Sequence, residues 1–291
     1  MTSNQDIWSQ WLLHRRCGGD SQQLQMLLDA LCPIRDAVLD HAKIRGDETL
    51  LDVGCGDGLI ALGALEQFPT CSVIFSDISK DLLNHVQSLV HSLNFSSRSQ
   101  FVQAAADDLA PIPDTSVDVV TTRSVLIYVD EKQRAFEEFY RVLKPNGRFS
   151  IFEPINRFSS PEPPQRFWWY DVGPITEIAD KVKRLYHQFQ PIETDPMLNF
   201  DERDLLHYAE QAGFQELHLE LRADIEPQTE DIQWDAWIQT AWNPKMPTLA
   251  EAVAQALNSD EAHQFMSYLR PLVENKQGRL RSAGAYIWGV K

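Results

Sequence analysis

The stretch TLLDVGCGDGLIALGAL at residues 49–65 places three glycines within five positions, between two apolar runs. Asp52 and Asp57 are its only charged residues. Glycine is needed where φ is positive or where a backbone or ligand comes very close. An apolar strand that enters such a turn, followed by an apolar helix, is typical of an α/β unit that binds a ligand at the carboxyl end of its strand. The stretch therefore predicts a strand, a tight ligand-binding turn and a helix.

Strand-like and helix-like patterns alternate on both sides of this stretch. Short runs rich in Val, Ile, Phe and Thr predict strands over residues 48–53, 72–77, 99–104, 117–122 and 147–152. Between them, residues 58–68, 79–93 and 130–144 place apolar side chains three and four positions apart, which predicts helices. Asp130 is the expected N-cap of the last helix, and KPNG at 144–147 its expected end. This order predicts a doubly wound α/β fold with a mostly parallel sheet and right-handed crossovers.

Composition limits the classes of function. The 291 residues include 26 basic and 42 acidic ones, a formal charge of −16, so the chain as a whole repels nucleic acid. No apolar run approaches the roughly 20 residues needed to cross a bilayer, and the first residues lack a leader pattern. Four cysteines without a CxxC pair indicate reduced thiols and no metal site. We expect a cytoplasmic protein that acts on a small molecule.

The glycine spacing points away from a dinucleotide. A dinucleotide fingerprint has the pattern GxGxxG, whereas here the third glycine comes one residue early and Leu59 follows it. Asp77 ends the second predicted strand, 23 residues after Gly54, where a carboxylate can accept both hydroxyls of a ribose. These features predict a cofactor that contains a ribose and is not NAD.

Four motifs carry a resemblance to a known family. LDVGCGDG at 51–58, FSDIS at 75–79, RVLKPNGRF at 141–149 and FEP at 152–154 follow the order seen in class I S-adenosylmethionine-dependent methyltransferases, and the core most resembles the quinone-biosynthesis and natural-product branch. The resemblance covers residues 48–154 and implies S-adenosylmethionine as cofactor and S-adenosylhomocysteine as product. It also implies a seven-stranded Rossmann-like sheet whose last strand is antiparallel.

The rest of the chain can be divided by comparison with that fold. Residues 200–214 match its late helix, 215–221 its sixth strand and 283–291 its seventh. The expected organisation is an N-terminal helical cap (1–46), a cofactor-binding core (47–154), an inserted lid (155–200), the late helix and sixth strand (201–222), a second helical insertion (223–282) and the last strand (283–291).

The resemblance implies roles for residues of the core. Gly54, Cys55, Gly56 and Gly58 let the backbone approach the methionine part of the cofactor. Asp52 reaches the methionyl ammonium directly or through water. Asp77 holds the ribose and Ile78 packs on the adenine, although a solvated acid at a strand end is the alternative for Asp77.

Three further residues, Ala106, Asp107 and Arg123, are candidates for contact with the cofactor. Related enzymes place an Asp-Ala pair after the third strand, whereas this chain has Ala105 and Ala106 there. Either Asp107 replaces the missing acid or the backbone near Ala106 reads the base, and Asp107 and Asp108 could instead cap a helix. Arg123 ends the fourth strand, where it binds a carboxylate or forms a structural ion pair.

Residues outside the core are expected to contact the acceptor. Ile7, Trp8, Trp11 and Leu12 share one face of an N-terminal helix that Gly18 ends, and His14 is expected at the surface. Arg15 and Arg16 suit the negative end of that helix, which often covers the cofactor in related enzymes. Trp11 and Arg15 are therefore acceptor candidates.

The inserted lid supplies the other acceptor candidates. Four consecutive aromatic residues, 167–170, are expected to cover the acceptor, so that Trp168, Trp169 and Tyr170 bind it. The alternative is that Trp168 and Trp169 fix the insertion to the sheet.

The predicted chemistry is methyl transfer to an O, N or C atom of a small molecule. A sulfonium methyl is already activated, so the enzyme mainly holds donor and acceptor in line and excludes water. A base is needed only when the acceptor must lose a proton, and Glu153, Tyr170 and Asp171 are the candidates. The acidic balance and the aromatic lid favour a neutral or apolar acceptor. The alternative function is a protein that binds the cofactor without turnover.

Overall fold

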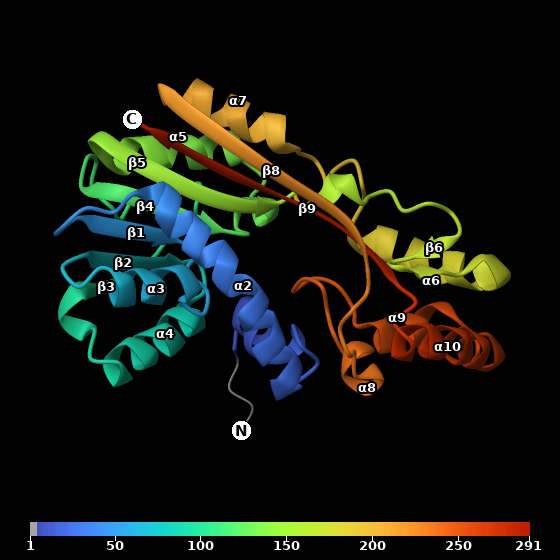
Figure 1. Ribbon diagram of the computed structural model, residues 1–291. Coiled ribbons are helices and arrows are strands. Elements are labelled where there is room, and N and C mark those ends of the chain that lie inside the picture. Colours follow the sequence, from blue (N-terminus) through green and yellow to red (C-terminus); the bar gives the residue numbers. More distant parts are fainter. Residues whose placement is uncertain (1–4) are drawn as a thin grey trace.

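A seven-stranded sheet forms the centre of the computed structural model, which describes residues 5–291 (Figure 1). The strand order is β3 (Ser99–Gln103), β2 (Ser72–Asp77), β1 (Thr49–Val53), β4 (Val117–Arg123), β5 (Leu143–Pro154), β9 (Arg279–Val290) and β8 (Glu216–Pro227). Strands β1 to β5 pair in parallel, whereas β9 is antiparallel to both β5 and β8. The predicted fold class is confirmed.

Helices cover both faces of the sheet. On one face α2 (Ser21–Ala42), α3 (Leu59–Gln67) and α4 (Lys80–Ser92) enclose one apolar cluster. On the other face α5 (Lys132–Val142) and α7 (Glu202–Ala212) enclose a second. The inner strands β1 and β4 are buried in nearly every position because helices cover both faces of the sheet.

The predicted ends of α5 are wrong by a residue or two. Glu131, not Asp130, occupies the N-cap, and it makes no side-chain capping bond. The helix stops at Val142, and residues 144–147 already belong to β5, with Asn146 at φ 62°. Strand pairing with β4 therefore begins at Leu143, before the turn residues that the sequence offers as a helix stop, whereas pairing with β9 begins after them, at Arg148.

The two insertions form one helical subdomain, which consists of β6 (Arg166–Phe167), β7 (Tyr170–Asp171), α6 (Thr176–Phe189), α8 (Trp234–Trp237), α9 (Leu249–Ala256) and α10 (Ser259–Glu274). They share a single apolar cluster, although more than forty residues separate α6 from α8 in sequence. Strands β8 and β9 pair over twelve residues each, beyond the rest of the sheet, and lead to this subdomain (Figure 1).

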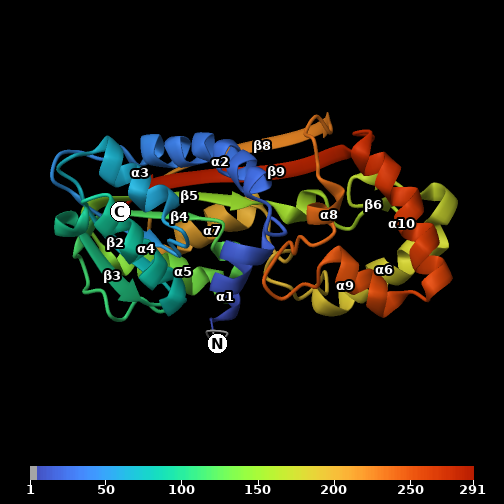
Figure 2. The ribbon, with the colours of Figure 1, turned by 90° about the horizontal axis from the view of Figure 1, so that it is seen from below.

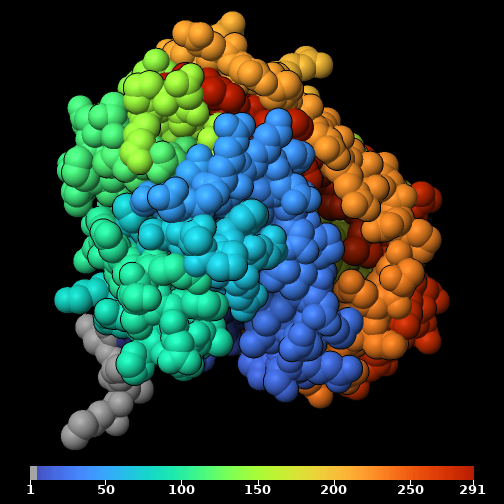
Figure 3. Space-filling view, turned by 60° about the vertical axis from the view of Figure 1, so that its left-hand side comes forward, coloured from blue at the N-terminus to red at the C-terminus, as the bar shows by residue number. Residues whose placement is uncertain are grey.

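The N-terminal residues lie between the sheet and the helical subdomain. Helix α1 (Ile7–Gln10) continues into a π-helical turn (Trp11–Arg15), and Figure 2 shows α1 below α2 on the side that faces the subdomain. In the space-filling view a hollow lies between part of α2, in blue, and the orange and red C-terminal part (Figure 3). Two details of the predicted helix are wrong, since Ile7 is exposed and the turn ends at Arg16, two residues before Gly18.

Within residues 5–291, no helix is long and apolar enough to cross a membrane.

Candidate functional site

A cavity of about 560 Å³ lies at the carboxyl ends of the parallel strands β1, β2, β3 and β4. We call it the first cavity. Its wall includes Trp8, Trp11, Leu12, Arg16, Asp52, Gly54, Cys55, Gly56, Asp57, Asp77, Ile78, Ala104, Ala105, Ala106, Asp107, Arg123, Tyr128, Asp130, Asn156, Met197 and Trp242. Open α/β sheets hold ligands at this edge.

The glycine turn forms the floor of the cavity. Gly54, Gly56 and Gly58 all have positive φ, at 64°, 55° and 88°. A Cβ on Gly54 would lie 2.3 Å from Val125, and one on Gly56 would lie 3.2 Å from Leu12. The turn can therefore follow this path only with glycine at these positions, and its backbone stays accessible from the cavity.

Asp77 connects the turn to the next strand. Its Oδ2 accepts the backbone N–H of Gly56 at 2.9 Å, and its Oδ1 accepts that of Ser79 at 2.8 Å. Burial raises the pKa of Asp77, and these two hydrogen bonds act against the rise. Each carboxylate oxygen keeps a second lone pair for a hydroxyl in the cavity.

The same region anchors the roof. The hydroxyl of Ser79 donates to Asp6 at 2.6 Å, and Asp6 caps α1 by accepting the N–H groups of Trp8 and Ser9. Hydrogen bonds therefore link the carboxyl end of β2, through Ser79, to the helix that covers the cavity.

Asp52 is a buried acid at the end of β1. Its Oδ1 accepts the Thr121 hydroxyl at 2.9 Å, and its Oδ2 accepts the Ala61 N–H at 3.2 Å. Burial raises its pKa to about 7, although the nearby Arg123 acts in the opposite direction. Such a carboxyl favours a cationic ligand, because a positive charge in the cavity stabilises its ionised form.

Arg123 brings a positive charge to the same part of the cavity. Its Nη1 donates to the Ser124 hydroxyl at 3.2 Å, and among residues 5–291 no carboxylate lies within ion-pair distance of its guanidinium. Burial lowers the pKa of Arg123, and so does Arg16, which also lines the cavity. Two guanidinium groups on one wall favour an anion between them.

The other end of the cavity is lined by the residues after β2 and β3. Ile78 is 55% exposed there, beside Ala105, Ala106 and Asp107. Asp108 makes a local contact instead, accepting the Ala110 N–H at 3.4 Å. An apolar side chain and the chain segment from Ala105 to Asp107 thus line this end of the cavity.

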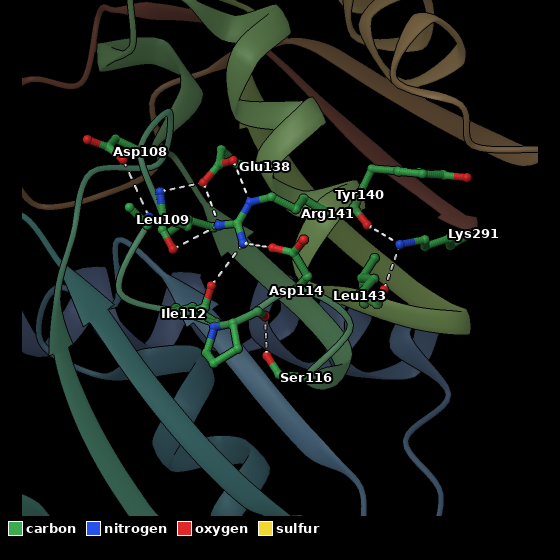
Figure 4. A network of polar contacts seen from close by, with 12 residues as sticks. Asp108, Leu109, Ile112, Asp114, Ser116, Glu138, Tyr140, Arg141, Leu143 and Lys291 are labelled. Carbon is green, nitrogen blue, oxygen red and sulfur yellow. Dashed lines mark hydrogen bonds and ion pairs between the residues drawn. The ribbon is translucent and has the colours of Figure 1, made fainter.

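Arg141 holds the loop that follows these residues, as Figure 4 shows. Its guanidinium donates to the carbonyls of Leu109 and Ile112 at 2.9 Å and to Asp114 at 2.6 Å. Glu138 pairs with Arg141 and accepts the Leu109 N–H at 2.7 Å. The RVLKPNGRF motif therefore begins with a residue that fixes the loop next to the cavity.

Aromatic residues of the N-terminal segment roof the cavity. The Trp8 and Trp11 rings meet Tyr128 edge-on, at 5.0 and 6.2 Å between centroids. The indole N–H of Trp11 donates to the Ala241 carbonyl at 2.7 Å, which fastens the roof to the helical subdomain. Arg15 lies outside the cavity and pairs with Glu251 at 2.7 Å.

None of the three candidate bases lines the first cavity. Glu153 is fully buried, accepts the N–H groups of Val125, Leu126 and Ile127, and has its pKa raised by burial to about 7. Tyr170 is fully buried and donates to Gln228 at 2.8 Å. Asp171 is exposed and accepts the Gly173 N–H. Each of these groups serves a local structural contact.

The predicted aromatic lid belongs to the helical subdomain. Phe167 and Tyr170 are core residues of its apolar cluster, joined in the β6–β7 pair. Trp168 and Trp169 are half-buried and line a second cavity of about 360 Å³ instead of the first. The aromatic run therefore does not line the first cavity, and its contact with the acceptor stays a prediction.

Sequence reasoning missed part of the cavity wall. Asn156, Met197 and Trp242 line both cavities. Asn156 follows directly after the FEP motif, and Trp242 belongs to the Trp-rich stretch 231–247, so weak signals were present. Met197 comes from an irregular segment after α6 whose position depends on tertiary contacts.

Comparisons with known proteins identify a family and relatives that this sequence resembles. Residues 51–151 match the methyltransferase domain family. The ubiquinone/menaquinone biosynthesis C-methyltransferase UbiE of Escherichia fergusonii is 33% identical over 116 residues, which are 40% of this chain and 46% of the relative, and that of Citrobacter koseri is 34% identical over the same length. The chain thus spans less than half the length of these curated relatives.

Solved structures share the fold. The [4+2]-cyclase SpnF superposes with a TM-score of 0.54 at 20% identity, over 90% of this chain and 81% of that one. A putative methyltransferase from Bacillus halodurans gives 0.53 at 17% identity, over 88% and 98%. Phosphoethanolamine N-methyltransferase 2 of Haemonchus contortus, in complex with S-adenosyl-L-methionine, gives 0.52 at 16% identity, over 98% and 56%. The resemblance to class I methyltransferases is confirmed.

Proposed function

We propose that this chain, with its methyltransferase domain at residues 51–151, is an S-adenosylmethionine-dependent methyltransferase that acts on a small-molecule acceptor. The observation that carries the proposal is the first cavity. The glycine turn, Asp52 and Asp77 line it within or beside the matched segment, at the strand edge where this fold holds ligands. Methylated acceptor and S-adenosylhomocysteine would be the products.

The wall of the cavity fits the parts of this cofactor. Asp77 would accept the ribose hydroxyls, and Ile78 would pack on the adenine while the backbone near Ala106 or Asp107 reads its edge. Gly54, Cys55, Gly56 and Gly58 would leave room for the methionine part. A buried acid such as Asp52 would gain little beside a neutral group of the ligand. Beside an ammonium it gains an ion pair.

The two arginines suit the carboxylate of the same methionine part. Arg123 is half-buried with one hydroxyl partner, so an anionic ligand would offset the desolvation of its charge. Arg16 adds a second donor from the roof. Asp52 and Arg123 would then bind opposite charges of one amino-acid group, which favours a zwitterion over a simple anion.

When bound, the cofactor supplies a methyl group on a sulfonium, which needs no further activation. The residues of the chain would therefore act by position. Trp8, Trp11 and Tyr128 exclude water from the cavity, and the glycine turn fixes the ligand against the strand edge. A dedicated base is not required by this mechanism, and Glu153, Tyr170 and Asp171 are all engaged elsewhere.

Two measurements test the proposal. Calorimetry should show binding of S-adenosylmethionine and S-adenosylhomocysteine, and no heat with NAD. Incubation with cofactor labelled at the methyl group and a panel of acceptors should then transfer the label. Binding without any transfer would favour the alternative, a protein that binds the cofactor without turnover, and the absence of binding would refute both functions.

A further inference from the structure

A second cavity adjoins the first, within the helical subdomain and the residues that lead to it. It has a volume of about 360 Å³. We propose that it holds the body of the methyl acceptor and that this acceptor is an aromatic acid, whose anionic group lies on a basic wall remote from the methylated atom. This inference rests on the proposed methyl transfer, because it names the acceptor of that reaction.

The two cavities meet at three shared residues. Asn156, Met197 and Trp242 line both, and the side-chain amide of Asn156 donates to the Met197 carbonyl at 3.3 Å. Asn156 follows β5, whereas Asp77 and Ile78 mark the opposite end of the first cavity, after β2. A molecule that extends from the second cavity would therefore enter the first at the end away from the expected adenine.

The second cavity has an aromatic wall. The Trp242 ring meets Trp168 and Trp169 edge-on, at 5.4 and 5.6 Å between centroids. Trp242 is 40% exposed although it is a large apolar residue between two cavities. Aromatic faces favour a flat, conjugated partner, since such a partner buries much area at little cost in side-chain entropy.

The charge of this wall is opposite to that of the protein. Three positively charged residues, Arg166, Lys183 and Arg281, line the cavity together with His187 and one acid, Glu162, although the chain carries a net charge of −16. Lys183 pairs with Asp180 at 3.6 Å. Local positive charge on an acidic protein concentrates anionic ligands where it lies.

The two arginines are available for such a ligand. Arg166 donates to the Trp169 carbonyl at 3.1 Å, and Arg281 lies over the Phe158 ring at 5.4 Å. In the chain from residue 5 onward, neither guanidinium lies in an ion pair with a carboxylate. Each keeps several N–H donors for a carboxylate. The composition of the whole chain favours a neutral acceptor. The acceptor contacts the wall of the cavity, however, and the basic residues of that wall favour an anionic acceptor instead.

The test uses 6-hydroxy-2-naphthoate, an aromatic acid whose hydroxyl and carboxylate lie at opposite ends of its two rings, and its methyl ester as the uncharged match. Fluorescence anisotropy follows the binding of each probe with and without saturating S-adenosylhomocysteine, and calorimetry follows S-adenosylhomocysteine alone. Arg281→Gln and Arg166→Gln remove charge from the wall, and Ile192→Trp fills the cavity. Arg203→Gln, on an α7 side chain that is 87% exposed, is the matched control.

We expect the acid to bind about tenfold more tightly than the ester. Arg281→Gln and Arg166→Gln should each weaken the binding of the acid by about tenfold and leave the binding of the ester unchanged, because only the acid carries a charge that pairs with these arginines. Ile192→Trp should weaken the binding of both probes, and Arg203→Gln should weaken the binding of neither. The affinity for S-adenosylhomocysteine should stay within about twofold of wild type throughout.

Equal binding of acid and ester, no binding of the acid, or wild-type affinity in the arginine and Ile192→Trp variants would overturn this inference. Those outcomes leave the proposed function intact as long as S-adenosylhomocysteine binds. Failure of S-adenosylhomocysteine to bind the wild-type protein would instead refute the proposed function.

Discussion

The carboxylate of Asp77 accepts the backbone N–H of Gly56 at 2.9 Å, so the acid at the end of β2 is held against the glycine turn that follows β1. The turn and the acid therefore form one rigid unit in the free protein. A ligand that uses both would meet a site already in its binding geometry, which lowers the entropic cost of binding.

Asp77→Ala should weaken both S-adenosylmethionine and S-adenosylhomocysteine by about 1.5–3 kcal/mol, the range for a hydrogen bond to a charged group. The substitution also leaves the N–H groups of Gly56 and Ser79 without their acceptor, so the melting temperature should fall. Calorimetry on variant protein shown to be folded measures the affinity. Unchanged affinity would remove Asp77 from the site.

Asp107→Asn should change cofactor affinity by less than about 1 kcal/mol. Asp107 lines the cavity beside Ala106, whose backbone can serve the adenine edge in place of the acid that related enzymes carry. The asparagine keeps the size of the side chain and removes its charge. A loss well above this range, measured by calorimetry at one ionic strength, would show that the carboxylate itself contacts the cofactor.

The sheet could be predicted from the sequence because its inner strands are buried on both faces. β1 and β4 are apolar or small in nearly every position, and their ends coincide with the residues named for the cofactor. The outer strands are different. β8 is exposed along much of its length and ends in ADIEP, which has no strand signal of its own, so its pairing with β9 determines where it ends.

The acceptor side could not be predicted because its contacts are distant in sequence. Trp11 meets the carbonyl of Ala241, 230 residues away, and no local pattern encodes that hydrogen bond. The burial of Tyr170 could not be predicted for a related reason. Its hydroxyl donates to Gln228, which comes from the other insertion. Local periodicity shows that a side chain will be buried, not which surface buries it.

Tyr170→Phe should destabilise the protein by about 1–3 kcal/mol, because Gln228 loses the donor to its buried carbonyl oxygen. Tyr170→Ala should cost about 3–5 kcal/mol through the cavity it leaves. Neither should change the affinity for S-adenosylhomocysteine, since Tyr170 lies in the apolar cluster of the helical subdomain. Denaturant titration and calorimetry check the two expectations. A stable Tyr170→Ala variant with altered acceptor kinetics would restore the lid interpretation.

Trp11→Phe should loosen the roof of the first cavity. It keeps an aromatic ring and removes the N–H that donates to Ala241, so S-adenosylhomocysteine should dissociate several times faster. Trp8→Phe is the matched control, because its ring also meets Tyr128 and its indole N–H makes no protein hydrogen bond within residues 5–291. Stopped-flow fluorescence measures the dissociation. Equal rates in the two variants would show that the hydrogen bond does not hold the roof.

Asp52 should couple cofactor binding to proton release. Burial raises its pKa to about 7 in the free protein, so at about pH 6 most molecules carry a neutral carboxyl there. A methionyl ammonium beside it favours the carboxylate, and the proton must then leave. Calorimetry at about pH 6 in phosphate buffer and in imidazole buffer should give different binding heats. For release of up to about one proton, the difference should approach the difference between the ionisation enthalpies of the two buffers, and it should shrink at about pH 8.

Two variants separate this effect from general titration. Asp52→Asn should remove the dependence on buffer, whereas Glu153→Gln should keep it, because Glu153 has a similarly raised pKa but lies outside the cavity. Between about pH 4 and pH 7, the Asp52 and Glu153 side chains bind more protons in the folded protein than in the unfolded protein. The free energy of unfolding of the ligand-free protein should therefore fall as the pH rises through that window. Each variant should reduce that slope. Binding heats that are the same in both buffers at about pH 6, or a buffer dependence that persists in Asp52→Asn, would show that Asp52 does not meet the cofactor's positive charge.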